Sequence, residues 1–107
     1  QKIDAYVAKA DGKQIRVCST SGVLDSRLKL LGFIFDPVLS AYVIDVSDIY
    51  QKAKIFSVLR DEGVAFSDGR EWCPSELFEY FREQNLLSGK FKRISWQDPL
   101  NFTVTEI

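Results

Sequence analysis

Residues 32–46, which read GFIFDPVLSAYVIDV, contain two runs of aromatic and β-branched residues on either side of Asp36-Pro37. Aromatic and β-branched side chains favour strands, while a proline that follows aspartate favours a turn. The stretch therefore predicts a β-hairpin, with strands at residues 33–35 and 41–46.

A short helix is expected immediately before this hairpin. Its leucines recur at the spacing of a helix face, at Leu24, Leu28 and Leu31. Serine and threonine favour the N-cap position, so residues 19–21 supply candidate helix starts. Because glycine readily ends a helix, Gly32 marks the expected stop.

The N-terminal residues predict another hairpin. Residues 3–9 and 14–18 alternate as strands do, and Asp11-Gly12 between them favours a two-residue turn. The chain is thus expected to begin with two paired strands, followed by the short helix and the 32–46 hairpin.

A second helix is expected after the 32–46 hairpin. Asp48 is a good N-cap, and Gln51 three residues later completes the pattern of a capping box. Gly63 provides the stop. The side chains expected to form its buried stripe are Ile49, Ala53, Phe56 and Leu59.

The last third of the chain repeats these kinds of element. Pro74 suits the first position of a helix, and Gly89 closes the segment that follows. The expected order is a strand at 64–66, a polar turn at 67–71, a helix at 74–87, a strand at 91–96, an Asp98-Pro99 turn and a strand at 102–107.

These elements predict one compact α+β domain over residues 1–107, with three helices on an antiparallel or mixed sheet of hairpins. Both halves of the chain contain strand, helix, glycine, aromatic strand, Asp-Pro turn and strand. They therefore fit a β-α-β-β unit used twice and joined by the central helix. The alternative is that glycine stops and Asp-Pro turns arose independently in each half.

Composition limits the classes of function. The chain has 107 residues, 14 basic against 15 acidic side chains and a formal net charge of −1, so no overall field attracts nucleic acid or an anionic membrane. No apolar run is long enough for a membrane helix. We expect an intracellular, cytoplasmic protein without membrane contact. Cys18 and Cys73 are expected as two reduced thiols, and the alternative is a disulfide between them.

The sequence contains few of the residues that catalysis and metal binding require. Two isolated cysteines and no histidine make a zinc site implausible, and no cofactor is expected. Paired carboxylates for Mg²⁺ would come from Asp45 with Asp48 or from Asp68 with Glu71, positions that also suit helix caps and polar turns.

The best nucleophile is Cys73, because a helix start lowers the pKa of a thiol. No histidine base is present to assist it. We therefore predict a protein without catalytic residues, and an enzyme built on carboxylates or on Cys73 is the remote alternative.

The leading functional hypothesis is an interaction domain, acting as a regulator, inhibitor or adaptor. Its aromatic side chains exceed what a small core needs, and tyrosine and tryptophan are enriched at protein interfaces. Leu77, Phe78 and Phe81 are expected in the core. The residues expected to dock a protein partner, together with an open sheet edge, are Tyr42, Trp72, Tyr80 and Trp96.

Nucleic-acid binding is the second hypothesis. Residues 90–96 interleave basic and aromatic side chains, as a stacking surface beside phosphate contacts requires. An edge strand protected by lysine predicts the same residues. The hypothesis requires one basic face formed by Lys90, Lys92 and Arg93 with Lys9, Lys13 and Arg16 of the first hairpin.

Overall fold

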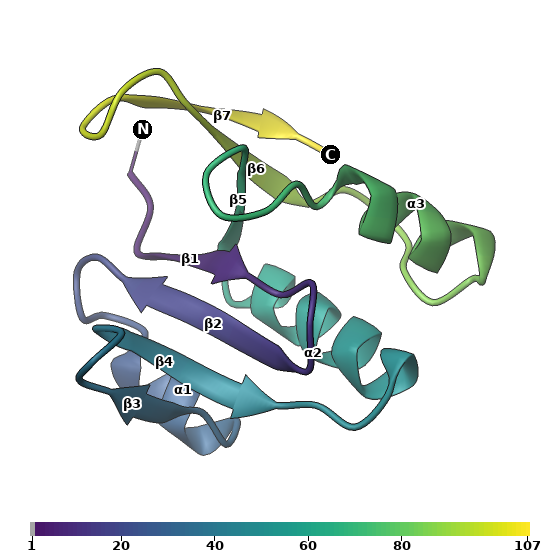
Figure 1. The fold of residues 1–107 in the computed structure, drawn as a ribbon, viewed down its shortest axis with the longest axis horizontal. Coiled ribbons are helices and arrows are strands. Elements are labelled where there is room, and N and C mark those ends of the chain that lie inside the picture. The colour runs from purple at the N-terminus through teal and green to yellow at the C-terminus, as the bar shows by residue number, and fades with distance from the viewer. Residues whose placement is uncertain (1) are drawn as a thin grey trace.

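The computed structural model describes residues 2–107, which form three helices and a single seven-stranded sheet (Figure 1). The strand order is β3-β4-β2-β1-β5-β6-β7. In chain order the elements are β1 (Ala5–Lys9), β2 (Gln14–Ser19), α1 (Asp25–Leu30), β3 (Ile34–Asp36), β4 (Ala41–Asp45), α2 (Ile49–Asp61), β5 (Ala65–Asp68), α3 (Ser75–Glu83), β6 (Lys92–Trp96) and β7 (Phe102–Glu106).

The sheet is mixed, which confirms the predicted α+β class. The hairpins β1–β2, β3–β4 and β6–β7 are antiparallel, as is the pairing of β2 with β4. Strand β5 lies between β1 and β6 and runs parallel to both. Such parallel pairs need crossover connections, and α3 provides the one between β5 and β6.

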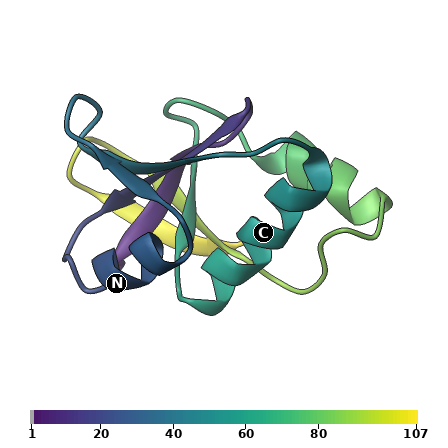
Figure 2. The same ribbon diagram turned by 90° about the horizontal axis from the view of Figure 1, so that it is seen from below.

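The two faces of the sheet differ because the helices cover one of them. Figure 2 shows α1 and α2 below the sheet, with α3 beside α2. On this helix face Val7, Val17 and Phe66 join the hydrophobic core. Successive strand residues alternate between faces, so Tyr6, Arg16 and other neighbours of these residues lie on the opposite side, called here the open face.

The centre of the core is an aromatic cluster around Phe56 of α2. The Phe56 ring centroid lies 5.0 Å from that of Phe66, 5.7 Å from that of Phe78 and 5.8 Å from that of Phe81. Phe91 completes the cluster through Phe66 and Phe78, at 5.6 and 4.9 Å. These edge-to-face and stacked contacts join both longer helices to the centre of the sheet.

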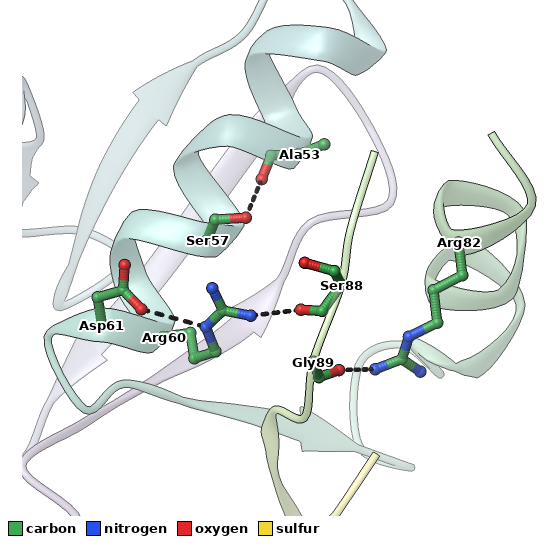
Figure 3. A network of polar contacts seen from close by, with 7 residues as sticks. All are labelled: Ala53, Ser57, Arg60, Asp61, Arg82, Ser88 and Gly89. Atoms are coloured by element: carbon green, nitrogen blue, oxygen red, sulfur yellow. Dashed lines mark hydrogen bonds and ion pairs between the residues drawn. The ribbon is translucent and has the colours of Figure 1, made fainter. Parts of the chain in front are cut away.

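Two arginines hold the segment between α3 and β6 (Figure 3). Arg60 donates to the carbonyl of Ser88 at 2.5 Å, and Arg82 donates to the carbonyl of Gly89 at 2.9 Å. Arg82 also donates to the carbonyl of Ile107 at 2.9 Å. The same two side chains thereby fix the entry to β6 and the C-terminal end of β7.

The first helix begins later than predicted. Leu24 occupies its N-cap, and no side chain caps it. The hydroxyl of Ser19 instead accepts the N–H of Gly22 at 3.2 Å and donates to Asp25 at 2.6 Å. The predicted N-cap at residues 19–21 is therefore wrong, because these hydroxyls shape the preceding turn.

The other helix boundaries follow local hydrogen bonding. Asp48 caps α2 as predicted, but Gln51 accepts the N–H of Ser47 at 2.7 Å, so the reciprocal half of the capping box is displaced by one residue. Helix α3 ends at Glu83 and not at residue 87. Asn85 adopts a positive φ of 58°, and the N–H of Leu86 donates to the carbonyl of Phe81.

The two halves share element order but differ in pairing. In the first half, β2 pairs antiparallel with β4, the second strand of the following hairpin. In the second half, β5 pairs parallel with β6, the first strand of the following hairpin. The two halves have the same order of strands and helix, but their strands pair differently, so they do not form a repeated β-α-β-β structure. Within residues 2–107, none of the helices has the length and apolar character needed to cross a membrane.

Lys52 is a charged residue in the middle of the buried side of α2. Its ammonium donates to the carbonyls of Ala10 and Gly12, at 2.7 and 2.5 Å, and so attaches the β1–β2 turn to the helix. Burial lowers the pKa of Lys52, while the charge of Asp11 acts in the opposite direction. The sequence pattern predicted only the apolar neighbours of this residue.

Replacing Lys52 tests this attachment. Lys52→Met keeps most of the side-chain volume but leaves two carbonyls without their donor, so we expect a loss of about 1–3 kcal/mol in the free energy of unfolding. The measurement is urea denaturation followed by circular dichroism. Lys54→Met, the same change at an exposed position of the same helix, is the control. Equal stability of the two variants would contradict the structural role of Lys52.

Candidate docking edge

Apolar side chains gather on the surface between the end of α1 and the start of β4. Ile34 is 72% exposed and Val38 is 93% exposed. We define the β3 surface by the five large apolar residues exposed in this segment, Leu30, Ile34, Phe35, Val38 and Leu39. Single exposed apolar residues are ordinary, but five of them within one short segment are a candidate for a binding surface.

A tight turn presents part of this surface. The carboxylate of Asp36 accepts the backbone N–H groups of Val38 and Leu39, at 2.9 and 3.2 Å. Ser40 then adopts a positive φ of 54°, which returns the chain to β4. Because the carboxylate satisfies the backbone of the turn, the side chains of Val38 and Leu39 are free to project from it.

The β3 surface lies along an edge of the sheet. Strand β3 pairs with β4 on one side and is the last strand in the order, so its other side has no strand neighbour among residues 2–107. At the opposite edge, the exposed residues of β7 are Thr103, Thr105 and Glu106. Polar and charged side chains protect an edge against pairing, whereas apolar ones invite it.

A groove of about 420 Å³ adjoins β3 on the sheet. Ile34, Phe35 and Val43 supply apolar contacts, and the two charged residues in its lining are Asp36 and Asp45. Gln14 donates weakly to Asp45, at 3.5 Å. The groove thus combines an apolar floor with negative charge, which favours an apolar ligand that also carries a positive group.

The aromatic residues predicted to bind a partner do not form one surface. Tyr42 is 5% exposed and Trp72 is 6% exposed, so both rings belong to the core. Tyr42 packs on the helix face against Phe35, with ring centroids 5.2 Å apart. Tyr80 is exposed and lines a separate groove of about 380 Å³ with Cys73. The prediction that Tyr42 and Trp72 contact a partner protein is therefore wrong, because both side chains are buried.

Trp96 lies on the open face, where side chains from other parts of the same chain cover its indole ring. The guanidinium of Arg70 stacks over the indole at 3.8 Å from the ring centroid. The rings of Tyr6 and Phe102 contact it at 5.6 and 5.3 Å, and its N–H donates to Ser67 at 2.9 Å. A nucleic-acid base would have to displace Arg70 before it stacked on this ring.

The predicted basic residues divide into two groups. Lys90 and Lys92 lie at the start of β6, whereas Lys9, Lys13 and Arg16 lie around the β1–β2 turn. Since β1, β5 and β6 are parallel, the start of β6 and the end of β1 are at opposite ends of the sheet. The single basic face required by the nucleic-acid hypothesis is not formed.

The remaining cation of that set, Arg93, is directed to the helix face. It lies beside Phe66, contacts Asp68 at 3.7 Å and donates to Thr105 at 3.1 Å. Strand β6 is paired on both sides, so the prediction of a lysine-protected edge strand at residues 90–96 is wrong.

The residues considered for catalysis also lie apart. Asp68 contacts Arg93, Glu71 pairs with Arg16 at 2.9 Å, and Asp45 lines the groove beside β3. Cys73 is exposed at the groove on α3, and both thiols are free. Across residues 2–107, no three acidic or cysteine side chains are grouped as metal ligands would be.

Comparison of the chain with protein-family models, curated protein sequences and solved structures gave no match. The structure alone therefore locates the candidate site. Sequence reasoning found the β3–β4 hairpin but not its exposed apolar surface. The sequence does indicate this surface at Val38-Leu39, because these two apolar residues occupy a turn where polar residues are usual.

The phenol of Tyr6 lies on the open face and has a raised pKa. Burial, followed by the adjacent hydrogen-bonded Cys18, raises the pKa of Tyr6 from 10.0 to about 12. The neutral phenol is thus favoured in the folded state. Its contribution to stability is complete below pH 10 and is lost as the pH rises toward 12.

An alkaline titration of tyrosinate absorbance tests this environment. We expect Tyr6→Phe to remove an ionisation step centred near pH 12. Tyr50→Phe, which alters an exposed ring, should leave that step in place. Retention of the full step in Tyr6→Phe would show that the phenol is not buried as described.

Proposed function

We propose that this chain is a non-catalytic interaction domain that docks a partner protein at the edge of β3. The partner contributes an extended segment, which pairs with β3 through backbone hydrogen bonds and continues the sheet. The observation that carries the proposal is the exposed apolar β3 surface, on a strand whose outer side has no strand neighbour among residues 2–107.

The two edges of the sheet support the choice of β3. At β7 the exposed side chains are polar, and Lys90 contacts Glu106 at 3.4 Å beside the strand. At β3 the exposed side chains Ile34 and Phe35 are apolar. Burying apolar area contributes about 25 cal/mol per Å², so an added strand gains affinity at β3 that it does not gain at β7.

Charge defines the partner segment further. Asp36 and Asp45 give the groove beside β3 a negative character. Ile34, Asp36, Val43 and Asp45 share one face of the sheet, so a segment that carries both apolar residues and lysine or arginine at its groove-facing positions, every second residue, can contact both the apolar residues and the carboxylates. We therefore assign a basic, apolar and extended peptide segment as the ligand.

A synthetic peptide provides the direct test. The probe carries valine and lysine in turn at every second position, with threonine between them, over about nine residues, enough to cover an edge strand. We expect saturable NMR shift changes at the backbone amides of β3 and its neighbours. A copy with alternate backbone nitrogens methylated on its pairing edge should not bind, because it lacks the donors that strand addition requires.

Matched surface variants test the location. Ile34→Ser with Val38→Ser should weaken peptide binding about tenfold, since it removes apolar contact area. Val23→Ser with Leu100→Ser changes two exposed apolar residues outside the β3 surface and should leave the affinity unchanged. Binding that is unaffected by both backbone methylation and the Ile34/Val38 variant would overturn the proposal.

A further inference from the structure

A small pocket lies at the turn between β1 and β2. Its volume is about 110 Å³, which suits one compact ion, and its lining includes Lys9, Lys13 and Arg16. Asp11, Gly12 and Gln14 complete the lining. We call this depression the hairpin pocket.

Sheet register brings like charges together in the hairpin pocket. Lys9 and Arg16 are direct cross-strand partners, next to an irregularity in the β1–β2 pairing. Like charges in directly opposite positions destabilise a sheet. Arg16 is partly neutralised by Glu71 at 2.9 Å, whereas Lys9 forms no ion pair within residues 2–107.

The guanidinium of Arg16 also has an unused donor. Its Nε atom is buried and has no hydrogen-bond partner in the part of the chain that the structure describes. A buried donor without an acceptor destabilises the folded state. Arg16 lines the hairpin pocket, so an anionic oxygen bound there is a candidate acceptor for this donor.

The charges behind the turn reinforce those in the pocket. The ammonium of Lys52 donates to the carbonyls of Ala10 and Gly12, directly beneath the turn. At the hairpin pocket, Asp11 and Glu71 oppose three cations, Lys9, Lys13 and Arg16. The cations outnumber the carboxylates, so the charge balance at the pocket is positive and favours a compact anion.

We propose that the hairpin pocket binds a phosphate monoester group. Such a group carries a charge of about −1.5 to −2 near neutral pH and offers three strong acceptor oxygens. Arginine and lysine are the usual donors to it. The pocket receives one phosphate, because Lys90 and Lys92 lie at the other end of the sheet and provide no continuing basic track.

This site is distinct from the docking edge and does not depend on it. Gln14 contributes to the lining of both the hairpin pocket and the groove beside β3, but the cations belong to the first hairpin alone. The variants that test the pocket therefore avoid Gln14 and all residues of the β3 surface.

Phosphopeptide titration tests the proposal on the intact chain. The probes are a short neutral peptide containing phosphoserine, its serine counterpart, inorganic phosphate and a single-stranded DNA oligonucleotide, each followed by NMR at constant ionic strength. We expect phosphate and phosphopeptide to shift amides at residues 9–16, while the serine peptide has no effect. Lys9→Gln with Lys13→Gln should weaken phosphopeptide binding at least about tenfold.

The control for charge is Lys54→Gln, which removes an exposed cation from α2 and should leave the affinity unchanged. Unchanged phosphopeptide affinity in the Lys9/Lys13 variant would overturn the site. Absence of saturable shifts with phosphate and phosphopeptide would do the same. Tighter binding of the oligonucleotide than of the phosphopeptide would replace the monoester site with nucleic-acid recognition.

Discussion

The contacts of the Phe56 ring are the constraint on which the rest of the structure depends. One side chain of α2 touches Phe66 on β5 and both Phe78 and Phe81 on α3. These partners come from the parallel centre of the sheet and from the crossover that makes the parallel pairing possible. Because the rings interlock, the position of α2 determines where β5 and α3 lie, and through Phe91 where β6 enters the sheet.

This central cluster explains why the two ends of the sheet differ. The longer helices pack around Phe56, and the remaining strands β4 and β3 receive only the short helix α1, of which Leu28 alone is buried. Cover on the helix face is therefore incomplete at β3, where Phe35 remains exposed, and Ile34 is exposed on the open face, which no helix covers. At the other end, Arg82 secures the Ile107 carbonyl beside β7, and that edge is polar. The apolar edge is thus a consequence of where the helices are placed.

Sequence alone predicts the features that neighbouring residues determine. The Asp36 turn, the Asp48 cap and the Gly63 stop each depend on a few adjacent residues, and all three are confirmed. The burial of Trp72 depends on strands and helices that meet only after folding, and the pairing of Lys9 with Arg16 depends on an irregularity in the register of the β1–β2 hairpin that the sequence pattern does not indicate. A periodic pattern also gives no reason to bury Lys52, since its acceptors lie 42 and 40 residues away in the chain.

The two proposed sites share a physical origin in the first half of the chain. Both expose groups that reduce the stability of an isolated domain, apolar side chains at β3 and like charges across β1 and β2. Neither lies in the aromatic cluster at the centre of the hydrophobic core. A fold that concentrates its stability in α2, β5 and α3 tolerates such unfavourable surfaces elsewhere, and a ligand that covers them recovers the free energy that they cost.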